Sequence, residues 1–265
     1  MKMGKRISFI FLAIIALLII LPLSLLFFWS FNGKWMYPTV FPEQYTLKVL
    51  HQMISETNFF PAILNTLVIA LGATIGSLLI ALPAARYFAF QKKWSQRFVE
   101  ILIYLPLILP TIAITTSSQI LFLRFHLTGS FSGIILIHIY FCLPYAMQIL
   151  LESYRKMGEG YSITAYTLGA GSLRTFRLVT WPLLRPGIIT SASLVFIVSC
   201  SQYLPTFFIG GGRIVTLPLL LLPYANNGRL GIASAYSLIF LGCTIVGVFI
   251  LKMMIGGMNH GRKYS

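Results

Sequence analysis

Long apolar runs alternate with short polar segments along the chain. A helix needs about 20 mostly apolar residues to cross the hydrocarbon core of a bilayer. Runs of this length predict six transmembrane helices, at residues 7–30, 60–90, 98–123, 131–151, 187–209 and 232–255. Prolines lie inside three of these runs: Pro83 predicts a break in the second, Pro106 and Pro110 predict breaks in the third, and the fourth contains Pro144. The fold class we predict is all-α, a polytopic membrane protein.

Composition supports this prediction. The chain is 57% hydrophobic and 9% charged, whereas soluble domains carry about 25% charged residues. Its net charge of +15 would suit nucleic acid, but Lys and Arg at the ends of apolar spans are more simply topology signals. We therefore expect membrane lipid as a partner and no nucleic acid.

Lys and Arg are unevenly distributed between alternate loops, and the richer side of a membrane protein is cytoplasmic. The poorer side holds only five, Lys34, Lys48, Arg124, Arg213 and Arg229. The other 15 share the opposite side with both ends of the chain. We therefore predict that both termini are cytoplasmic.

The segments between spans also carry patterns. The run 7–30 follows three cations as a signal peptide does, but it is too long for a typical signal and predicts a retained anchor. Leu47, Leu50, His51 and Ile54 have helical spacing, which predicts a short helix on the outer interface. The run 217–222 is too short to span, so it is either re-entrant or interfacial.

The predicted cytoplasmic segment 153–186 is too long for a tight turn. We expect a helix at 161–168 that ends at Gly169, then a second helix at 172–181 with Ser172 as its N-cap. Pro182 and Pro186 would then redirect the chain into the fifth span. An exposed helix–turn–helix with a basic face fits a docking surface, and a solvated basic loop fits equally well.

The same segment resembles the "EAA" signature of ABC importer permeases. Gly169, Val179 ten positions later, and Pro182 match the glycine, the branched residue and the proline of that signature. The E-A-A positions fall on Ile163, Thr164 and Ala165, so only the last of the three matches. Further likeness lies in "NTLVIALGATIGSLLIALPAA" from Asn65, "YLPLILP", "HIYFCLPYAMQILLESYRKM" and "SQYLPTFFIGGGRIVTLPLLL".

This resemblance implies a transport complex in the bacterial cytoplasmic (inner) membrane. A second permease subunit, identical or similar, completes the path; two ABC ATPase subunits drive it; an extracytoplasmic substrate-binding protein delivers the solute. The chain lacks the phosphate-binding sequence GxxxxGK[ST], so ATP and Mg²⁺ would be bound by the partner ATPase and no cofactor by this chain. The implied domains are an N-terminal anchor and outer segment at 1–59, a permease domain at 60–258, and a tail at 259–265.

In the family, a short coupling helix between the fourth and fifth spans docks on the ATPase. Carried onto this chain, the coupling residues are Glu159, Ile163, Thr164, Ala165, Gly169, Ala170, Arg174, Phe176, Arg177 and Pro182. Ile163 replaces the usual glutamate and cannot accept a hydrogen bond. Three alternatives follow: Glu159, one turn earlier, substitutes for it, the ATPase presents a matched apolar groove, or the subunit is weakly coupled.

Neutral polar residues within the spans are the candidates for the translocation path. They are Tyr104, Gln119, Ser199, Ser201, Gln202 and Tyr203. Hydrogen bonding between helices is the alternative role for such residues, and for His138. The group of permeases that this layout resembles carries polyamine, iron(III), sulfate or thiamine, and residues 201–213 most resemble permeases of thiamine transport.

Other function classes fit less well. An intramembrane hydrolase needs a nucleophile with an oriented base, yet Ser199 and His138 lie in different predicted spans and the chain has no Asp. A channel or secondary transporter usually carries a filter motif or coupling charges, and neither is visible. The histidines and the three cysteines are scattered, so we predict no metal site and no catalytic residue.

Overall fold

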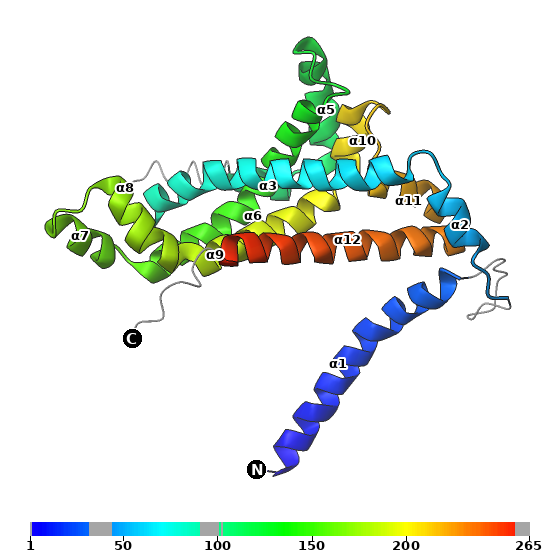
Figure 1. The fold of residues 1–265 in the computed structure, drawn as a ribbon, viewed down its shortest axis with the longest axis horizontal. Helices are drawn as coiled ribbons and strands as arrows, with labels where there is room; N and C mark the ends of the chain where they lie inside the picture. Colours follow the sequence, from blue (N-terminus) through cyan, green and yellow to red (C-terminus); the bar gives the residue numbers. More distant parts are fainter. Residues whose placement is uncertain (1, 32–43, 91–100, 102, 258–265) are drawn as a thin grey trace. The chain divides into compact units, whose positions relative to one another are not determined.

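A computed structural model describes residues 2–31, 44–90, 101 and 103–257. Every regular element in those ranges is a helix (Figure 1). The long helices are α1 (Lys2–Trp29), α3 (Phe59–Phe90), α6 (Phe131–Met157), α9 (Trp181–Cys200) and α12 (Leu230–Gly256). The shorter ones are α2 (Lys48–Ile54), α5 (Thr111–Arg124), α7 (Gly160–Thr167), α8 (Ser172–Thr175), the π-helical turn η1 (Phe176–Thr180), α10 (Leu204–Gly210) and α11 (Leu217–Asn226). The all-α prediction is confirmed.

Five helices of the described residues are long and apolar enough to cross a membrane: Phe11–Trp29, Phe59–Phe90, Phe131–Met157, Ser172–Cys200 and Leu230–Gly256. They correspond to five of the six predicted spans. The start of the remaining one, 98–100, lies outside the described residues, as do 32–43 and the predicted tail 259–265. Its second half is α5, whose 14 residues begin directly after Pro110, so the break expected at that proline is observed. The break expected at Pro83 is absent, because Pro83 lies inside the continuous helix α3.

The fifth span differs from its prediction at both ends. Pro182 and Pro186 lie inside a continuous helix, Ser172–Cys200, and do not redirect the chain. The π-helical turn η1 ends at Thr180, two residues before Pro182, and widens the helix in the turn that this proline would otherwise crowd. Ser172 is the first residue of α8, and the N-cap position is Gly171. The span ends at Cys200, because residues 201–203 form a turn before α10.

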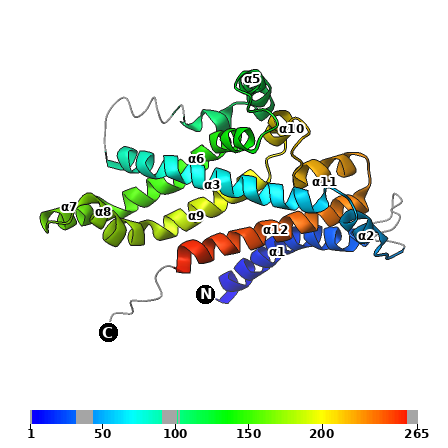
Figure 2. The ribbon, with the colours of Figure 1, turned by 45° about the horizontal axis from the view of Figure 1, so that its top comes forward.

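The described chain forms two compact units. The larger comprises Leu64–Thr216 and Cys243–Ser265. In it α6 and α9 run side by side, as both ribbon views show (Figures 1 and 2). Its main core joins α3, α6 and α9 through Ala81, Ala85, Cys142, Ala146, Leu150, Tyr154, Leu184, Ile188 and Val195.

Glycines let α3 approach α6 closely. A β-carbon at Gly72 would lie 2.7 Å from Ile135 Cδ1, and one at Gly76 would meet Ile139 Cδ1 still closer. The two glycines form a G-x-x-x-G pair, which places both on one face of α3. Lipid tails are as apolar as the side chains, so close packing of this kind holds membrane helices together.

The smaller unit comprises Met1–Ile63 and Leu217–Gly242. The Glu56 carboxylate accepts hydrogen bonds from the hydroxyls of Tyr224 and Tyr236, whose rings stack with centroids 5.7 Å apart. Burial, followed by the nearby Glu56 charge, raises the pKa of the Tyr224 hydroxyl, which keeps it protonated as a donor. These contacts join the α2–α3 connection to α11 and α12.

Val49 and Met53 of α2 are buried. Of the residues in the predicted pattern, His51 and Ile54 of α2 and Leu47 just before it are exposed, and Leu50 is half-buried. The helix expected in the outer segment is therefore present. The face that the sequence pattern identified as apolar is the exposed one. Such a face is available to the membrane interface.

Candidate functional site

The segment between α6 and α9 is a defined structure rather than a loose loop. Gly158, at φ 72°, ends α6, and α7 follows at Gly160–Thr167. Gly169, at φ 79°, then reverses the chain. The Gly169 N–H donates to Tyr166 O at 2.9 Å and the Ala170 N–H donates to Ala165 O at 3.0 Å. This pair of bonds is the Schellman motif, which needs a residue at positive φ where a β-carbon is penalised.

The buried side of the segment attaches it to the rest of the larger unit. Ser162 and Thr175 are buried, and Arg86 Nη2 of α3 donates to the Tyr166 hydroxyl of α7 at 3.3 Å. The Phe176 and Trp181 rings lie 6.2 Å apart. Between this segment and α3 is a cavity of about 570 Å³, lined partly by Arg86, Glu159 and Phe176. The Arg86–Tyr166 hydrogen bond therefore attaches α7 to α3.

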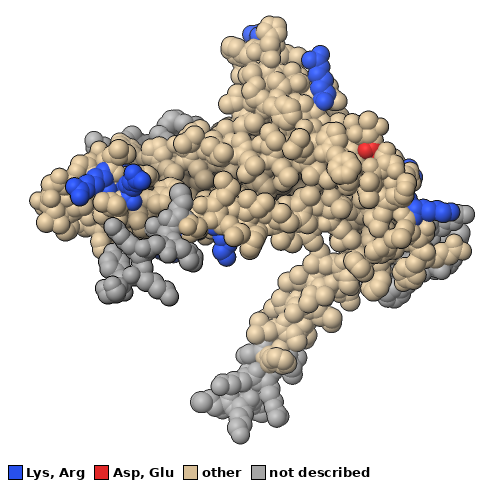
Figure 3. Space-filling model, in the orientation of Figure 1, with Lys and Arg blue, Asp and Glu red and all other residues tan. Residues whose placement is uncertain are grey.

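The exposed side of the segment carries several large apolar side chains. The side chains of Leu168 and Leu173 are 82% and 80% exposed, and those of Ile163 and Leu178 are more than half exposed. Arg174 and Arg177 are exposed beside them. Lys and Arg side chains gather over α8 on the face drawn in Figure 3. We call the side chains Ile163, Leu168, Leu173, Arg174, Arg177 and Leu178 the coupling surface, after the role predicted for this segment.

The remaining predicted coupling residues support this surface or border it. Thr164 Oγ1 donates within α7 to Gly160 O at 2.9 Å, and Ala165 and Ala170 are half-buried. Glu159 precedes α7 and makes no side-chain cap; its side chain lines the cavity described above. Pro182 is half-buried in the first turn of α9.

The predicted path residues gather around α5 and the α9–α10 turn, with Tyr104 in the helical stretch 103–108 before α5. Gln119 Nε2 of α5 donates to Phe208 O of α10 at 3.3 Å. Ser201 is exposed and donates to Val198 O at 2.9 Å. The Tyr203 ring stacks on Phe207, with centroids 5.8 Å apart. Thr115 and Thr116, by contrast, donate to carbonyls of their own helix.

His138 is the residue that organises this region. It is buried on α6, with Nδ1 2.8 Å from Ser199 Oγ of α9 and Nε2 3.0 Å from Thr206 Oγ1 of α10. Thr206 donates its one hydroxyl proton to Gln202 O at 2.8 Å. Nε2 therefore donates to Thr206, and Nδ1 accepts the proton of Ser199. The interhelical hydrogen bonding considered for His138 is observed, and it also includes Ser199.

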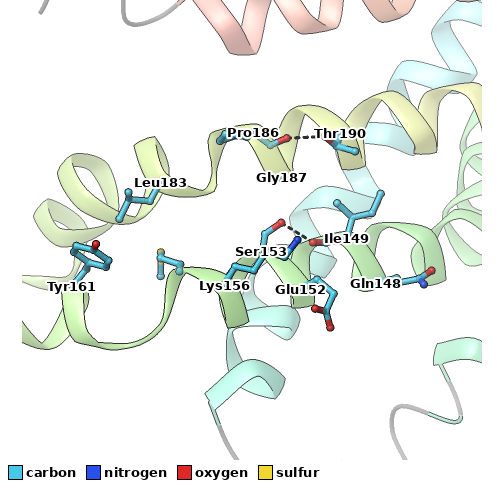
Figure 4. A pocket seen from close by; sticks show the side chains of 11 residues that line it. Gln148, Ile149, Glu152, Ser153, Lys156, Tyr161, Leu183, Pro186, Gly187 and Thr190 are labelled. Carbon is cyan, nitrogen blue, oxygen red and sulfur yellow. Dashed lines mark hydrogen bonds between the residues drawn. The ribbon is translucent and has the colours of Figure 1, made fainter. Parts of the chain in front are cut away.

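A groove opens between α6 and α9, next to α7 (Figure 4). It holds about 840 Å³ and is lined by Gln148, Ile149, Glu152, Ser153, Lys156 and Met157 of α6, Leu183, Pro186, Gly187 and Thr190 of α9, and Tyr161 of α7. Gly187 allows the two helices to approach, because a β-carbon there would clash with Ser153 Oγ. Sequence reasoning missed this groove, whose two sides come from separate spans.

Comparison with known proteins explains this arrangement. Residues 77–259 match the family model described as binding-protein-dependent transport system inner membrane component. The chain belongs to this family. Its members are permease subunits of ABC transporters, which are non-catalytic because separate subunits hydrolyse ATP. The family and the apolar helices together make the chain a multi-pass inner-membrane protein.

Several curated permeases are similar in sequence. The inner membrane ABC transporter permease protein YnjC of Escherichia coli (strain K12) is 27% identical over 67% of this chain and 33% of its own length. The thiamine transport system permease protein ThiP of Brucella suis biovar 1 is 26% identical over 69% of this chain and 37% of its own. The chain thus spans about a third of the length of both proteins.

Other relatives match over more of their length. The spermidine/putrescine transport system permease protein PotC homolog of Mycoplasma pneumoniae is 28% identical over 76% of this chain and 74% of its own length. Among solved structures, a bacterial ABC transporter involved in the import of the acidic polysaccharide alginate aligns with a TM-score of 0.68 over 97% of both chains, at 16% identity. That structure supports the fold.

Proposed function

We propose that this chain is a transmembrane subunit of an ABC importer that moves a small solute delivered by an extracytoplasmic binding protein. The main support for this proposal is the coupling surface. Its apolar side chains are exposed on a segment attached to the larger unit, and the chain belongs to this permease family. In this proposal the segment 153–186 is cytoplasmic and contacts an ATPase subunit. Both termini are cytoplasmic, and a sixth span is completed by residues before α5.

The chemistry of the coupling surface fits a protein partner. Burying a leucine side chain stabilises a contact by about 1.5–3 kcal/mol relative to leaving it in water. Leu168 and Leu173 are both available for such burial. Ile163 stands where the family signature has a glutamate, so we propose that the ATPase groove is apolar at this point. Arg174 and Arg177 would then meet acidic groups at its rim.

The complete transporter would contain two permease chains, identical or similar, and two ATPases that bind ATP and Mg²⁺. The groove between α6 and α9, and the turn at 201–203, would border the path between the permeases. Tyr104, Gln119, Ser201, Gln202 and Tyr203 remain the residues we assign to that path. Ser199 is buried and bonded to His138, so we assign it to helix packing instead.

For the solute we propose thiamine or a related small molecule. The support is the likeness of residues 201–213 to thiamine permeases, together with the similarity to ThiP. Ser201 and Gln202 are neutral where polyamine permeases tend to be acidic, which disfavours a polycation. Polyamine, iron(III) and sulfate remain the competing solutes, and the relatives include a molybdate/tungstate permease, WtpB of Pyrococcus abyssi.

The test is uptake by proteoliposomes that contain the chain, its ATPase and its binding protein. We expect ATP-dependent uptake of labelled thiamine, with spermidine, iron(III), sulfate and molybdate as the compared solutes. Uptake of one of these instead would replace the solute and keep the transporter. If the chain purifies with no ATPase and no solute enters in an ATP-dependent manner, the proposed function is wrong.

A further inference from the structure

A second groove lies between α9 and the part of α12 that belongs to the larger unit. It holds about 870 Å³. Its lining is Arg185, Pro186, Ile189, Thr190, Ser193, Leu194 and Ile197 from α9, and Val248, Lys252 and Gly256 from α12. No carboxylate is among these lining residues.

The two cations gather at one end of the groove. Lys252 is exposed, and Gly256 ends α12 one turn later. Arg185 Nε donates to Ile255 O of the last turn of α12 at 2.8 Å. The Nη2 of the same guanidinium is buried and has no hydrogen-bond partner among the described residues. This end therefore offers a buried donor with unused capacity beside an exposed ammonium group.

The other end of the groove is aliphatic. Ile189, Leu194 and Ile197 follow Arg185 along α9, and Val248 lies one turn before Lys252 on α12. Ile197 lies 12 positions after Arg185, which corresponds to about 18 Å along the helix at 1.5 Å per residue. One leaflet of the hydrocarbon core is about 15 Å thick. The apolar length therefore matches an acyl chain that lies along the helix.

We propose that this groove binds an anionic phospholipid. Its phosphate accepts from Arg185 Nη2 and from the Lys252 ammonium, and one acyl chain lies along Ile189, Leu194, Ile197 and Val248. Basic pockets between spans hold anionic headgroups in this way. The proposal does not depend on the solute or on the ATPase.

A second copy of this chain is the other occupant to consider. The chain has five acidic residues against 20 Lys and Arg, so another copy is a poor complement to a groove with a basic end. A lipid phosphate complements that end, and a lipid tail complements the aliphatic end. Both features of the groove are then used by one molecule.

The experiment is native mass spectrometry of the full-length chain in detergent, titrated with dioleoyl phosphatidylglycerol or with zwitterionic dioleoyl phosphatidylcholine. We expect preferential binding of phosphatidylglycerol. Lys252→Gln should weaken that binding about fivefold, the effect of about one interfacial cation. Val248→Trp should fill the aliphatic end and reduce it further. Arg185 is left intact, because it also bonds to α12.

The matched control is Lys156→Gln, which removes a lysine near the end of another span outside this groove. It should bind phosphatidylglycerol as the unmodified chain does, and excess inorganic phosphate should not displace the lipid. The proposal is overturned if both lipids bind equally, if Lys156→Gln weakens binding as much as Lys252→Gln, or if inorganic phosphate competes. The proposal is also overturned if Val248→Trp binds lipid as the unmodified chain does, or if Leu194→Cys cross-links two copies of the chain through this groove.

Discussion

His138 joins three helices through its two ring nitrogens. Ser199 donates to Nδ1, Nε2 donates to Thr206, and Thr206 donates to Gln202 O, so four polar groups satisfy one another. An unpaired polar group costs more within a bilayer than in water, since no solvent can replace its partner. The network therefore stabilises the packing of α6 against α9 and α10, and it fixes the turn to which Ser201, Gln202 and Tyr203 belong.

Replacing His138 with leucine should destabilise the protein. Two interhelical hydrogen bonds are lost, and such bonds in membrane proteins average about 0.6 kcal/mol, so we expect a loss of about 1–2 kcal/mol. Unfolding of the purified chain in mixed micelles measures it. Gln148→Leu, at an exposed position of the same helix, is the control and should change stability little. Equal stability of His138→Leu and the unmodified chain would show that the network is not structural.

At the scale of elements, the contact of α3 with α6 depends on glycine. A side chain at Gly76 must displace Ile139, so Gly76→Leu should destabilise the pair by about 1–3 kcal/mol, the usual effect of overpacking. Ile139→Ala should restore part of that stability by removing the obstructing atoms. The same micelle unfolding assay measures both variants.

Gly242→Leu is the control for the glycine prediction, because a β-carbon at Gly242 of α12 has nothing within 4 Å. It tests whether a leucine in place of a glycine within a span lowers stability by itself. If Gly76→Leu and Gly242→Leu have the same stability, or if Ile139→Ala fails to rescue Gly76→Leu, the close α3–α6 contact does not depend on glycine.

Local patterns predicted most of these elements. The lengths of the apolar runs predicted five of the spans. The glycine at 169 predicted where α7 ends. The fold of 172–200 could not be predicted from proline positions, because a π-helical turn lets Pro182 remain within a helix. Contacts between distant segments left no local signal. Glu56 and Tyr236 are 180 positions apart, and the α6–α9 groove exists only once the two helices pair.

The uneven distribution of Lys and Arg predicts how the whole molecule is oriented in the membrane. Asn227 and Ser172 are both exposed and lie in different connections between spans. Placed singly as cysteines in a chain without its three native cysteines, Asn227→Cys should react with an impermeant thiol reagent added to intact cells, and Ser172→Cys should not. Labelling of Ser172→Cys from outside would reverse the orientation. Ser95, a further cytoplasmic position by this prediction, lies outside the described residues.

We propose that the α7–α8 segment couples ATP hydrolysis to movement of the membrane helices. Gly169 and Gly228 have φ of 79° and 69°, and a β-carbon at either meets nothing within 4 Å. Valine at either position therefore introduces similar backbone strain, about 1–2 kcal/mol. Only Gly169 lies in the proposed contact with the ATPase, and Gly228 lies in the turn between α11 and α12.

The decisive measurement is ATP-driven uptake, together with solute-stimulated ATP hydrolysis, in proteoliposomes of the assembled transporter that carry either variant. Gly169→Val should insert and bind the binding protein normally, yet lose uptake and stimulated hydrolysis. Gly228→Val should retain both. If the Gly169→Val transporter imports solute as well as the Gly228→Val one, the α7–α8 segment does not couple ATP hydrolysis to transport.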